Sequence, residues 1–280
     1  MSVRNNEERL GAVQSESSPA SSANVNDPLN FIVPTMHVDL PSKGRYYPKG
    51  HPLHNQESIE IRFMTAKDED ILTSPNLIKK GIVLNRLLQN LILDKSIKVD
   101  DILLGDKNAI LIQARMSGYG PWYEVSINCP ACGHKQEEAY DLEECSKIYE
   151  GDSDIEGVSY LENGNILYKL PKTQIECEIK FLTGKEEKML LKKLATDDGA
   201  ENLPSLQMKM TIVGVNGRHE EELIDYFIEN MPIPDARALR KTYDKISPNA
   251  KLETKYICES CDHQEDMEVP LTADFFWPDL

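Results

Sequence analysis

Apolar and polar residues alternate over residues 58–63, where the sequence SIEIRF predicts a half-buried strand. Thr65 follows this strand and precedes the acidic segment AKDEDIL, which is the pattern of a capped helix start. Apolar residues then recur at helical spacing through NLIKKGIVLNRLLQNLIL. The segment LLGDKNAILIQARM predicts a further helix with Asp106 as its N-cap. PWYEVSIN and HKQEEAYDL predict two strands that flank a Cys-Pro-Ala-Cys turn, so the pattern indicates an α+β fold.

The second part of the chain repeats this order of elements. EIKFLTGKEEKML resembles EIRFMTAKDEDIL, with Thr183 in the place of Thr65 at an offset of 118 residues. PIPDARALRKTY matches LLGDKNAILIQA, with Asp235 in the place of Asp106 at an offset of 129. KLETKYICESCDHQEDMEVPL matches WYEVSINCPACGHKQEEAYDL at the same offset. These matches predict an internally duplicated unit of strand, helices and zinc-knuckle hairpin, and the change in offset fits an insertion of 11 residues between about 190 and 231.

Composition divides the chain into three stretches. Residues 1–30 are rich in Ser, Asn, Ala and Glu and predict a disordered N-terminal tail. Residues 31–145 contain an extended arm and the first repeat, and we call them the first half. Residues 146–280 contain the rest of an acidic connector, in which we expect one strand, followed by the second repeat and an aromatic C-terminus; we call them the second half.

Two aromatic clusters have two interpretations each. Phe275, Phe276 and Trp277 are consecutive near the end of the sequence, and Tyr46 and Tyr47 are adjacent in the arm. Exposed aromatic clusters mark interfaces, whereas buried ones complete a core. The sequence leaves both alternatives open.

Four of the six cysteines fall in two C-x-x-C turns, each between predicted strands. Zinc takes four ligands in a tetrahedron, and each hairpin offers two thiolates. We therefore predict a split four-cysteine zinc ribbon with one structural Zn²⁺ per chain, whose ligands are Cys129, Cys132, Cys258 and Cys261. If the halves pack about a pseudo-twofold axis, the ion takes two ligands from each half and ties them together.

The remaining candidate ligands have simpler interpretations. His134 and His263 each stand two residues after the second cysteine of a turn. We interpret both as surface residues rather than alternative ligands, because four thiolates already fill a structural site. Cys145 and Cys177 have no ligand spacing, and we expect ordinary, partly buried thiols.

Two other functions of C-x-x-C turns compete with a structural metal. A thiol oxidoreductase needs a helix N-terminus after the first cysteine, whereas both turns here lie between strand-like segments with acidic neighbours. A zinc-ribbon nucleic-acid adaptor needs positive charge, whereas 31 basic and 47 acidic residues give a net charge of −16. We therefore disfavour both functions and predict that the chain binds no nucleic acid.

The sequence contains none of the common catalytic or targeting patterns. It lacks a phosphate-binding glycine loop, G-x-S-x-G and H-E-x-x-H, so we predict that the protein is not an enzyme and has no small-molecule substrate. No run of about 18 apolar residues predicts a membrane span. The first residues lack the apolar core of a secretory signal, so we expect the chain to stay in the cytoplasm where it is made.

Several segments resemble one protein family. LPSKGRYYPKGHPL, IEIRFMTAKDEDILTS with LIKKG, FIENMPIPDARALRKTY, CESC and VPLTADFFWP are similar to the baseplate proteins of T-even-like contractile-tailed bacteriophages. The similarity covers roughly residues 36–280 and points in particular to the baseplate hub subunit and hub assembly proteins. It implies a late viral protein that takes part in virion and tail assembly in the host cytoplasm by contacting other hub proteins, without catalytic residues. Whether such a protein stays in the virion baseplate or leaves after assembly is open at this point.

Overall fold

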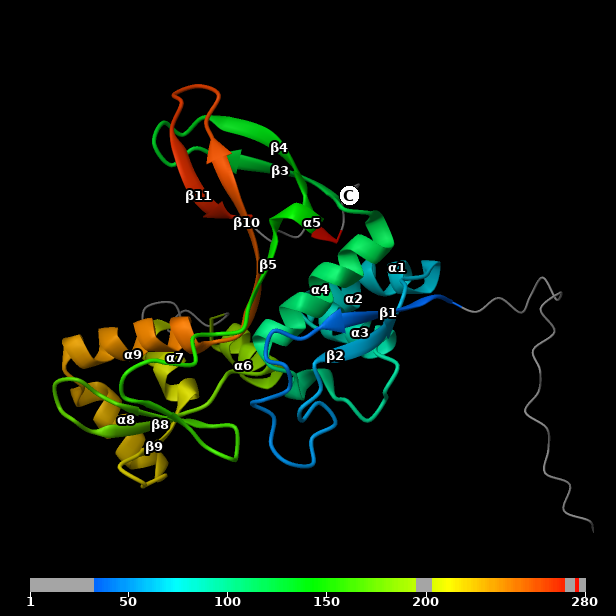
Figure 1. Ribbon diagram of the computed structural model, residues 1–280. Helices are drawn as coiled ribbons and strands as arrows, with labels where there is room; N and C mark the ends of the chain where they lie inside the picture. The colour runs from blue at the N-terminus through cyan, green and yellow to red at the C-terminus, as the bar shows by residue number, and fades with distance from the viewer. Residues whose placement is uncertain (1–32, 195–202, 270–274, 277–280) are drawn as a thin grey trace, which may run out of the picture. The chain divides into compact units, whose positions relative to one another are not determined.

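The first half of the chain contains two antiparallel hairpins, with helices between them in the sequence. The computed structural model describes residues 33–194, 203–269 and 275–276, which are coloured in Figure 1. β1 pairs with β2, and β3 pairs with β4. The elements are β1 (Thr35–Asp39), β2 (Ser58–Arg62), α1 (Ala66–Leu72), α2 (Pro75–Lys79), α3 (Val83–Leu91), the 3-10 turn η2 (Val99–Asp101), α4 (Leu104–Tyr119), β3 (Trp122–Asn128), β4 (Lys135–Asp141) and α5 (Leu142–Cys145).

Local sequence signals explain where the first helices begin and end. Thr65 is the N-cap of α1, as predicted, and its N–H and hydroxyl both donate to the carboxylate of Asp68. The apolar run that follows forms two helices, α2 and α3, rather than one continuous helix. Gly81 lies between them with a φ of 63°, a left-handed conformation that favours glycine and ends a helix.

Asp106 does not cap α4, so this part of the sequence prediction was wrong. Leu103 is the N-cap, and Asp106 is the third residue of the helix. Its buried carboxylate accepts hydrogen bonds from the Ser42 N–H (2.9 Å), the Ser42 hydroxyl (2.6 Å) and the Tyr47 hydroxyl (2.7 Å). Tyr47 is 2% exposed, so the core interpretation is right for this residue. Asp106 thus attaches the N-terminal arm to α4.

The second half contains two further sheets, ordered β6-β7-β8-β9 and β11-β10-β5, in which every pairing is antiparallel. The acidic connector holds two strands, β5 and β6, rather than one, because β5 pairs with the distant β10. No described helix has the length and apolar character needed to cross a bilayer. The elements are β5 (Ser146–Tyr149), β6 (Val158–Tyr160), β7 (Ile166–Lys169), β8 (Glu176–Ile179), α6 (Gly184–Leu194), α7 (Leu203–Thr211), β9 (Ile212–Val215), α8 (Glu221–Asn230), α9 (Ile233–Ile246), β10 (Asn249–Ile257) and β11 (Gln264–Glu268).

Each half has a turn that begins with Leu-Pro and is held by an aspartate of a later helix. The Leu-Pro pairs are residues 40–41 and 170–171. In the second half, Asp235 of α9 accepts hydrogen bonds from the N–H groups of Lys172 (2.8 Å) and Thr173 (3.0 Å). The aspartate of α4 holds the first of these turns in the corresponding way. Sequence comparison overlooked this feature, although the repeated Leu-Pro pair could have indicated it.

Backbone and side-chain contacts join the two halves. The Leu104 N–H donates to the Leu182 carbonyl at 3.0 Å, which links the start of α4 to the segment before α6. Lys107, a buried lysine of α4, forms an ion pair with Glu187 of α6. The described residues from Thr35 onward cluster into one compact unit. The proposed division of the chain at residue 145 stays a prediction.

The aromatic residues near the C-terminus belong to the core. Phe275 and Phe276 are 2% and 3% exposed, and the Phe275 ring makes an edge contact with Tyr123 of β3 at 5.2 Å between centroids. The buried Arg115 guanidinium donates to the Phe275 carbonyl at 2.5 Å. The core interpretation is therefore right for these two residues, while Trp277 lies outside the described residues.

Candidate metal centre

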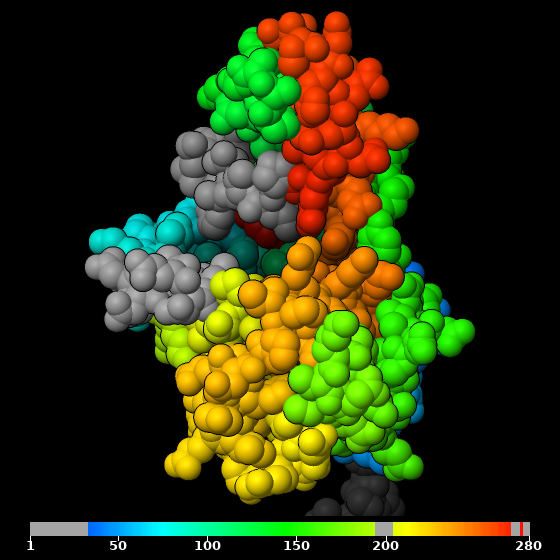
Figure 2. Space-filling model, turned by 90° about the vertical axis from the view of Figure 1, so that its left-hand side faces the viewer, coloured from blue at the N-terminus to red at the C-terminus, as the bar shows by residue number. Residues whose placement is uncertain are grey.

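The two C-x-x-C turns lie at the tips of the β3–β4 and β10–β11 hairpins, which run side by side (Figure 1). Figure 2 shows the same two hairpins pressed together in the space-filling view. The four sulfur atoms all lie within 4.8 Å of one another. The Sγ atoms of Cys129 and Cys261 are 3.7 Å apart, as are those of Cys132 and Cys258. The structure thus brings together the four cysteines predicted as ligands.

The spacing of the sulfur atoms fits a tetrahedral metal ion. A metal–sulfur bond of about 2.3 Å in a regular tetrahedron places the sulfurs about 3.8 Å apart. The two distances of 3.7 Å agree with this value. Four thiolates in a tetrahedron are the donor set of structural zinc and of some iron centres. The residues present therefore suit such an ion.

The cluster has a local twofold relationship. Exchanging the two turns maps the Cys129–Cys261 pair onto the Cys258–Cys132 pair, and the two pairs have the same separation. Burial follows the same rule, because the first cysteine of each turn is buried and the second is exposed. Each hairpin therefore contributes one inner and one outer sulfur atom.

The backbone of the two turns is closed by matching hydrogen bonds. The Cys129 N–H donates to the His134 carbonyl at 2.8 Å, and the Cys258 N–H donates to the His263 carbonyl at 2.9 Å. The His134 side chain is exposed and that of His263 is half-buried, with Nε2 3.5 Å from a carboxylate oxygen of Glu265. Neither imidazole belongs to the cluster of ligand atoms found among the described residues. The histidines act here through their backbone carbonyls.

The residue after each second cysteine has a left-handed backbone. Gly133 has a φ of 72° and Asp262 has a φ of 56°. Glycine adopts this conformation at little cost, and aspartate tolerates it better than most other residues do. The two turns therefore share one backbone shape despite their different sequences.

Hydrogen-bond donors in each turn favour the thiolate form of its first cysteine. Burial acts to raise the pKa of Cys258, but the N–H groups of Ser260 and Cys261 outweigh it and lower the pKa to about 6. Burial likewise opposes the lowered pKa of Cys129, which results from the N–H groups of the last two residues of its own turn. Thiolates are the form that binds metal, so this arrangement suits the first cysteine of each turn as a ligand. The His263 N–H acts to lower the pKa of Cys261, but the neighbouring thiols and burial outweigh it and raise the pKa to about 12.

A buried glutamine joins the two hairpins beside the cysteines. Gln136 of β4 is 5% exposed. Its Oε1 accepts hydrogen bonds from the Tyr256 hydroxyl (3.2 Å) and the Glu259 N–H (3.1 Å), and its Nε2 donates to the Ile257 carbonyl (3.0 Å) and the Glu138 carboxylate (2.6 Å). Sequence analysis did not select this residue. A polar side chain at an inward position of an alternating strand was the available signal.

The other two cysteines lie apart from the cluster. Cys145 is 6% exposed and Cys177 is 0% exposed, so both are more buried than the sequence predicted. Burial raises the pKa of both thiols, that of Cys177 to about 12. Neutral, buried thiols of this kind behave as small apolar side chains.

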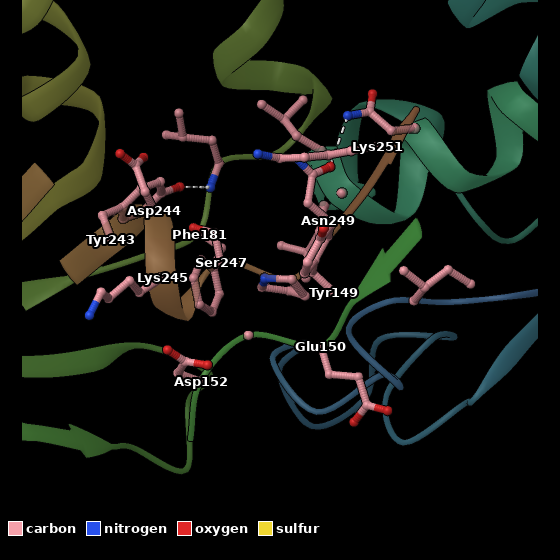
Figure 3. A pocket seen from close by; sticks show the side chains of 18 of the residues that line it. Tyr149, Glu150, Asp152, Phe181, Tyr243, Asp244, Lys245, Ser247, Asn249 and Lys251 are labelled. Carbon is pink, nitrogen blue, oxygen red and sulfur yellow. Dashed lines mark hydrogen bonds between the residues drawn. The ribbon is translucent and has the colours of Figure 1, made fainter. Parts of the chain in front are cut away.

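A groove of about 780 Å³ lies between the start of α4, the end of α9 and the strands β5 and β10 (Figure 3). Residues of both halves line the groove. Two hydrogen bonds lie in its wall: the Leu182 N–H donates to the Tyr243 hydroxyl, and the Asn108 side-chain amide donates to the side-chain oxygen of Asn249. Acidic and basic side chains are mixed in its lining, and no His or Cys is among them. The group of candidate metal ligands found among the described residues lies at the cysteine turns and not in this groove.

Comparison with known proteins supports one family. Neither the curated proteins nor the solved structures include a match to this chain. A family model described as T4 bacteriophage base plate protein matches residues 33–277. That span covers both cysteine turns and all of the described residues. The chain belongs to the family of T4 bacteriophage base plate proteins.

Proposed function

We propose that this protein is a component of the baseplate hub of a contractile phage tail, and that one zinc ion held between its halves stabilises it. Membership of the baseplate family supports a baseplate role and protein partners. The observation that carries the zinc proposal is the cluster of four sulfur atoms from two hairpins, with cross-hairpin distances of 3.7 Å. The protein acts by contacting other hub proteins during assembly in the host cytoplasm, and it carries out no catalysis.

Matching local structures support the duplication within this proposal. In the first half, Thr65 and Asp68 form a capping box, and Arg62 binds the same carboxylate. In the second half, the Thr183 N–H and hydroxyl donate to the Glu186 carboxylate, which also binds a lysine of the preceding segment. The two aspartate-held Leu-Pro turns and the two cysteine hairpins follow the same order. We infer that the ion joins equivalent hairpins of a duplicated chain.

The site favours a structural metal over thiol exchange. The two sulfur–sulfur contacts at 3.7 Å run between the hairpins, whereas a redox C-x-x-C pair exchanges electrons within one turn. Both turns connect strands, so neither has the helix N-terminus that activates a redox cysteine. Zinc bound by four thiolates leaves no open coordination position, which fits a structural role.

Charge disfavours a nucleic-acid adaptor. Residues 122–141 and 249–268, which form the two hairpins, contain ten acidic residues and three lysines. Such a surface repels a phosphate backbone. A protein partner is therefore the better assignment for this region.

Native mass spectrometry tests the metal proposal. We expect one zinc per chain in the freshly purified protein, and free thiols after denaturation without reductant. Iron in its place would retain the structural site but reject zinc. A metal-free chain with a disulfide inside either turn would contradict the structural site and favour the oxidoreductase.

The baseplate proposal has a separate test. An affinity-tagged chain, expressed during infection by its own phage, should co-purify with hub proteins, while a tagged capsid protein serves as the control. Mass spectrometry of purified particles then distinguishes a permanent subunit from an assembly factor. Failure to recover any baseplate protein would contradict the hub assignment, whatever the metal content.

A further inference from the structure

We infer that Gln136 is a positioning residue for the metal centre, because it holds the second C-x-x-C turn in the conformation that binds the ion. This inference rests on the proposed zinc site. Gln136 touches no sulfur in the described contacts, and it acts through the backbone of the turn.

The contacts of Gln136 lie on both sides of a ligand. Its amide nitrogen donates to the carbonyl of Ile257, directly before Cys258, and its amide oxygen accepts the N–H of Glu259, directly after it. The same oxygen accepts the Tyr256 hydroxyl, which fixes the orientation of the amide. A ligand held in this way loses less conformational freedom when the ion binds, so its intrinsic affinity is higher.

The first turn lacks this support, although its geometry matches. Pro130 occupies the position that Glu259 has in the second turn, and proline has no N–H to donate. Glu265 occupies the position in β11 that Gln136 has in β4, and its carboxylate lies 3.5 Å from Nε2 of His263. Gln136 therefore positions one turn of the pair, and the first turn depends on its own backbone hydrogen bonds and on proline rigidity.

The first test replaces the glutamine with an apolar side chain of similar length. We expect Gln136→Met to weaken zinc binding roughly 10- to 100-fold in competition with a chromophoric chelator, the range found when groups that orient metal ligands are removed. The variant loaded with Co²⁺ should keep the absorption bands of a four-thiolate site, because no ligand is lost. Gln264→Met is the matched control, since Gln264 is exposed on β11, and its affinity should stay within about twofold of the parent.

A second variant removes one hydrogen bond and leaves Gln136 in place. Glu259→Pro deletes the N–H donor, and the equivalent Pro130 indicates that this turn accommodates proline. We expect weaker zinc binding by Glu259→Pro and unchanged binding by Glu259→Ala, which keeps the N–H. In the double variant with Gln136→Met, the two losses should be less than additive, because both changes break the same contact.

The outcomes separate this inference from the proposal beneath it. If the parent protein binds neither zinc nor Co²⁺, the metal proposal fails. If the parent binds zinc, and Gln136→Met and Glu259→Pro bind it as tightly as the parent does, the positioning role is overturned and the metal proposal stands. Equal losses in Glu259→Ala and Glu259→Pro would also overturn it, because the effect would then come from the exposed carboxylate.

Discussion

The two halves of the chain form the same cysteine turn on different supports. The backbone bonds that close the turns differ by 0.1 Å, at 2.8 and 2.9 Å, and the cross-hairpin sulfur distances are equal. β3 has seven residues and pairs with β4, whereas β10 has nine residues and pairs with both β5 and β11. The two halves share the geometry of the cysteine turns, which a shared ion would require, while their strand lengths and pairings differ.

The helix starts in the two halves share one arrangement of side chains but differ in how deeply their ion pairs are buried. Arg62 binds both oxygens of the fully buried Asp68, at 2.7 and 2.8 Å. Lys180 makes one bond to Glu186 at 2.8 Å and is 35% exposed. A buried pair leaves an uncompensated charge when one partner is removed, whereas an exposed lysine is readily replaced by water.

The largest expected effect therefore separates these two pairs. Arg62→Ala should lower the free energy of unfolding by about 3 kcal/mol or more, and Lys180→Ala by about 1 kcal/mol or less. Urea denaturation of the metal-saturated proteins measures both losses. Equal losses would show that burial does not distinguish the two helix starts.

Acid should remove the advantage of the first pair. Burial acts to raise the pKa of Asp68, but hydrogen bonds from Arg62, Thr65 and Asn90 outweigh it and lower the pKa to about 2. The folded-state pKa lies below the ordinary value near 4, so the carboxylate stabilises the fold above about pH 4 and loses this effect as the pH falls toward 2. The stability difference between the parent and Asp68→Asn should shrink by on the order of 2 kcal/mol over this interval. A difference that does not change with pH would contradict the lowered pKa.

The sequence predicted features whose information is local or repeated. The Thr65 cap and the strand before it depend on neighbouring residues, and both formed as expected. The four cysteines were identifiable because the C-x-x-C pattern occurs twice in the chain, although Cys129 and Cys261 are 132 residues apart. Single long-range contacts left no such trace. Asp106 was assigned as a cap because its partners Ser42 and Tyr47 lie 64 and 59 residues away.

The same limit explains the other omissions. Gln136 bonds to residues 120 to 123 positions further along, and its counterpart in the second hairpin is Glu265, so the repeat did not mark it. β5 became a strand by pairing with β10, about 100 residues away in the sequence. Burial of Phe275 depends on contacts with Tyr123 and Arg115. In each case the structure is determined by a contact with residues far away in the sequence, and neither periodicity nor composition encodes such a contact.

The aspartates that hold the two Leu-Pro turns should respond differently to amide substitution. Asp106 accepts two hydroxyls and one N–H, and burial raises its pKa despite these bonds. Burial also opposes ionisation of Asp235, but the Lys172 N–H, the Thr173 hydroxyl and the Thr173 N–H outweigh it and lower the pKa. Hydroxyls can rotate to accept from an amide, whereas backbone N–H groups cannot.

We therefore expect Asp235→Asn to lower the free energy of unfolding by about 1–3 kcal/mol, because an amide NH₂ group would face a backbone donor. Asp106→Asn should cost about 1 kcal/mol or less, since its oxygen can face the Ser42 N–H while its NH₂ group donates to a hydroxyl oxygen. Thermal unfolding of the two variants, both saturated with metal, gives the comparison. A larger loss for Asp106→Asn would mean that its negative charge, rather than its acceptor geometry, holds the arm.

The smallest expected effect concerns the left-handed residue after each cysteine turn. An added Cβ at Gly133 would meet no atom within 4 Å. Gly133→Ala should therefore lower the free energy of unfolding by about 1 kcal/mol through backbone conformation alone. Asp262→Gly should raise the free energy of unfolding by about 0.5 kcal/mol. Glycine relieves the left-handed strain, and the larger entropy of the unfolded chain offsets part of this gain. Asp262→Asn separates the contribution of charge, since asparagine tolerates the same backbone and carries no charge near the thiolates. If Asp262→Gly and Asp262→Asn stabilise the protein equally, then repulsion between Asp262 and the anionic cysteine cluster, rather than backbone strain, is the cost that distinguishes the second turn from the first.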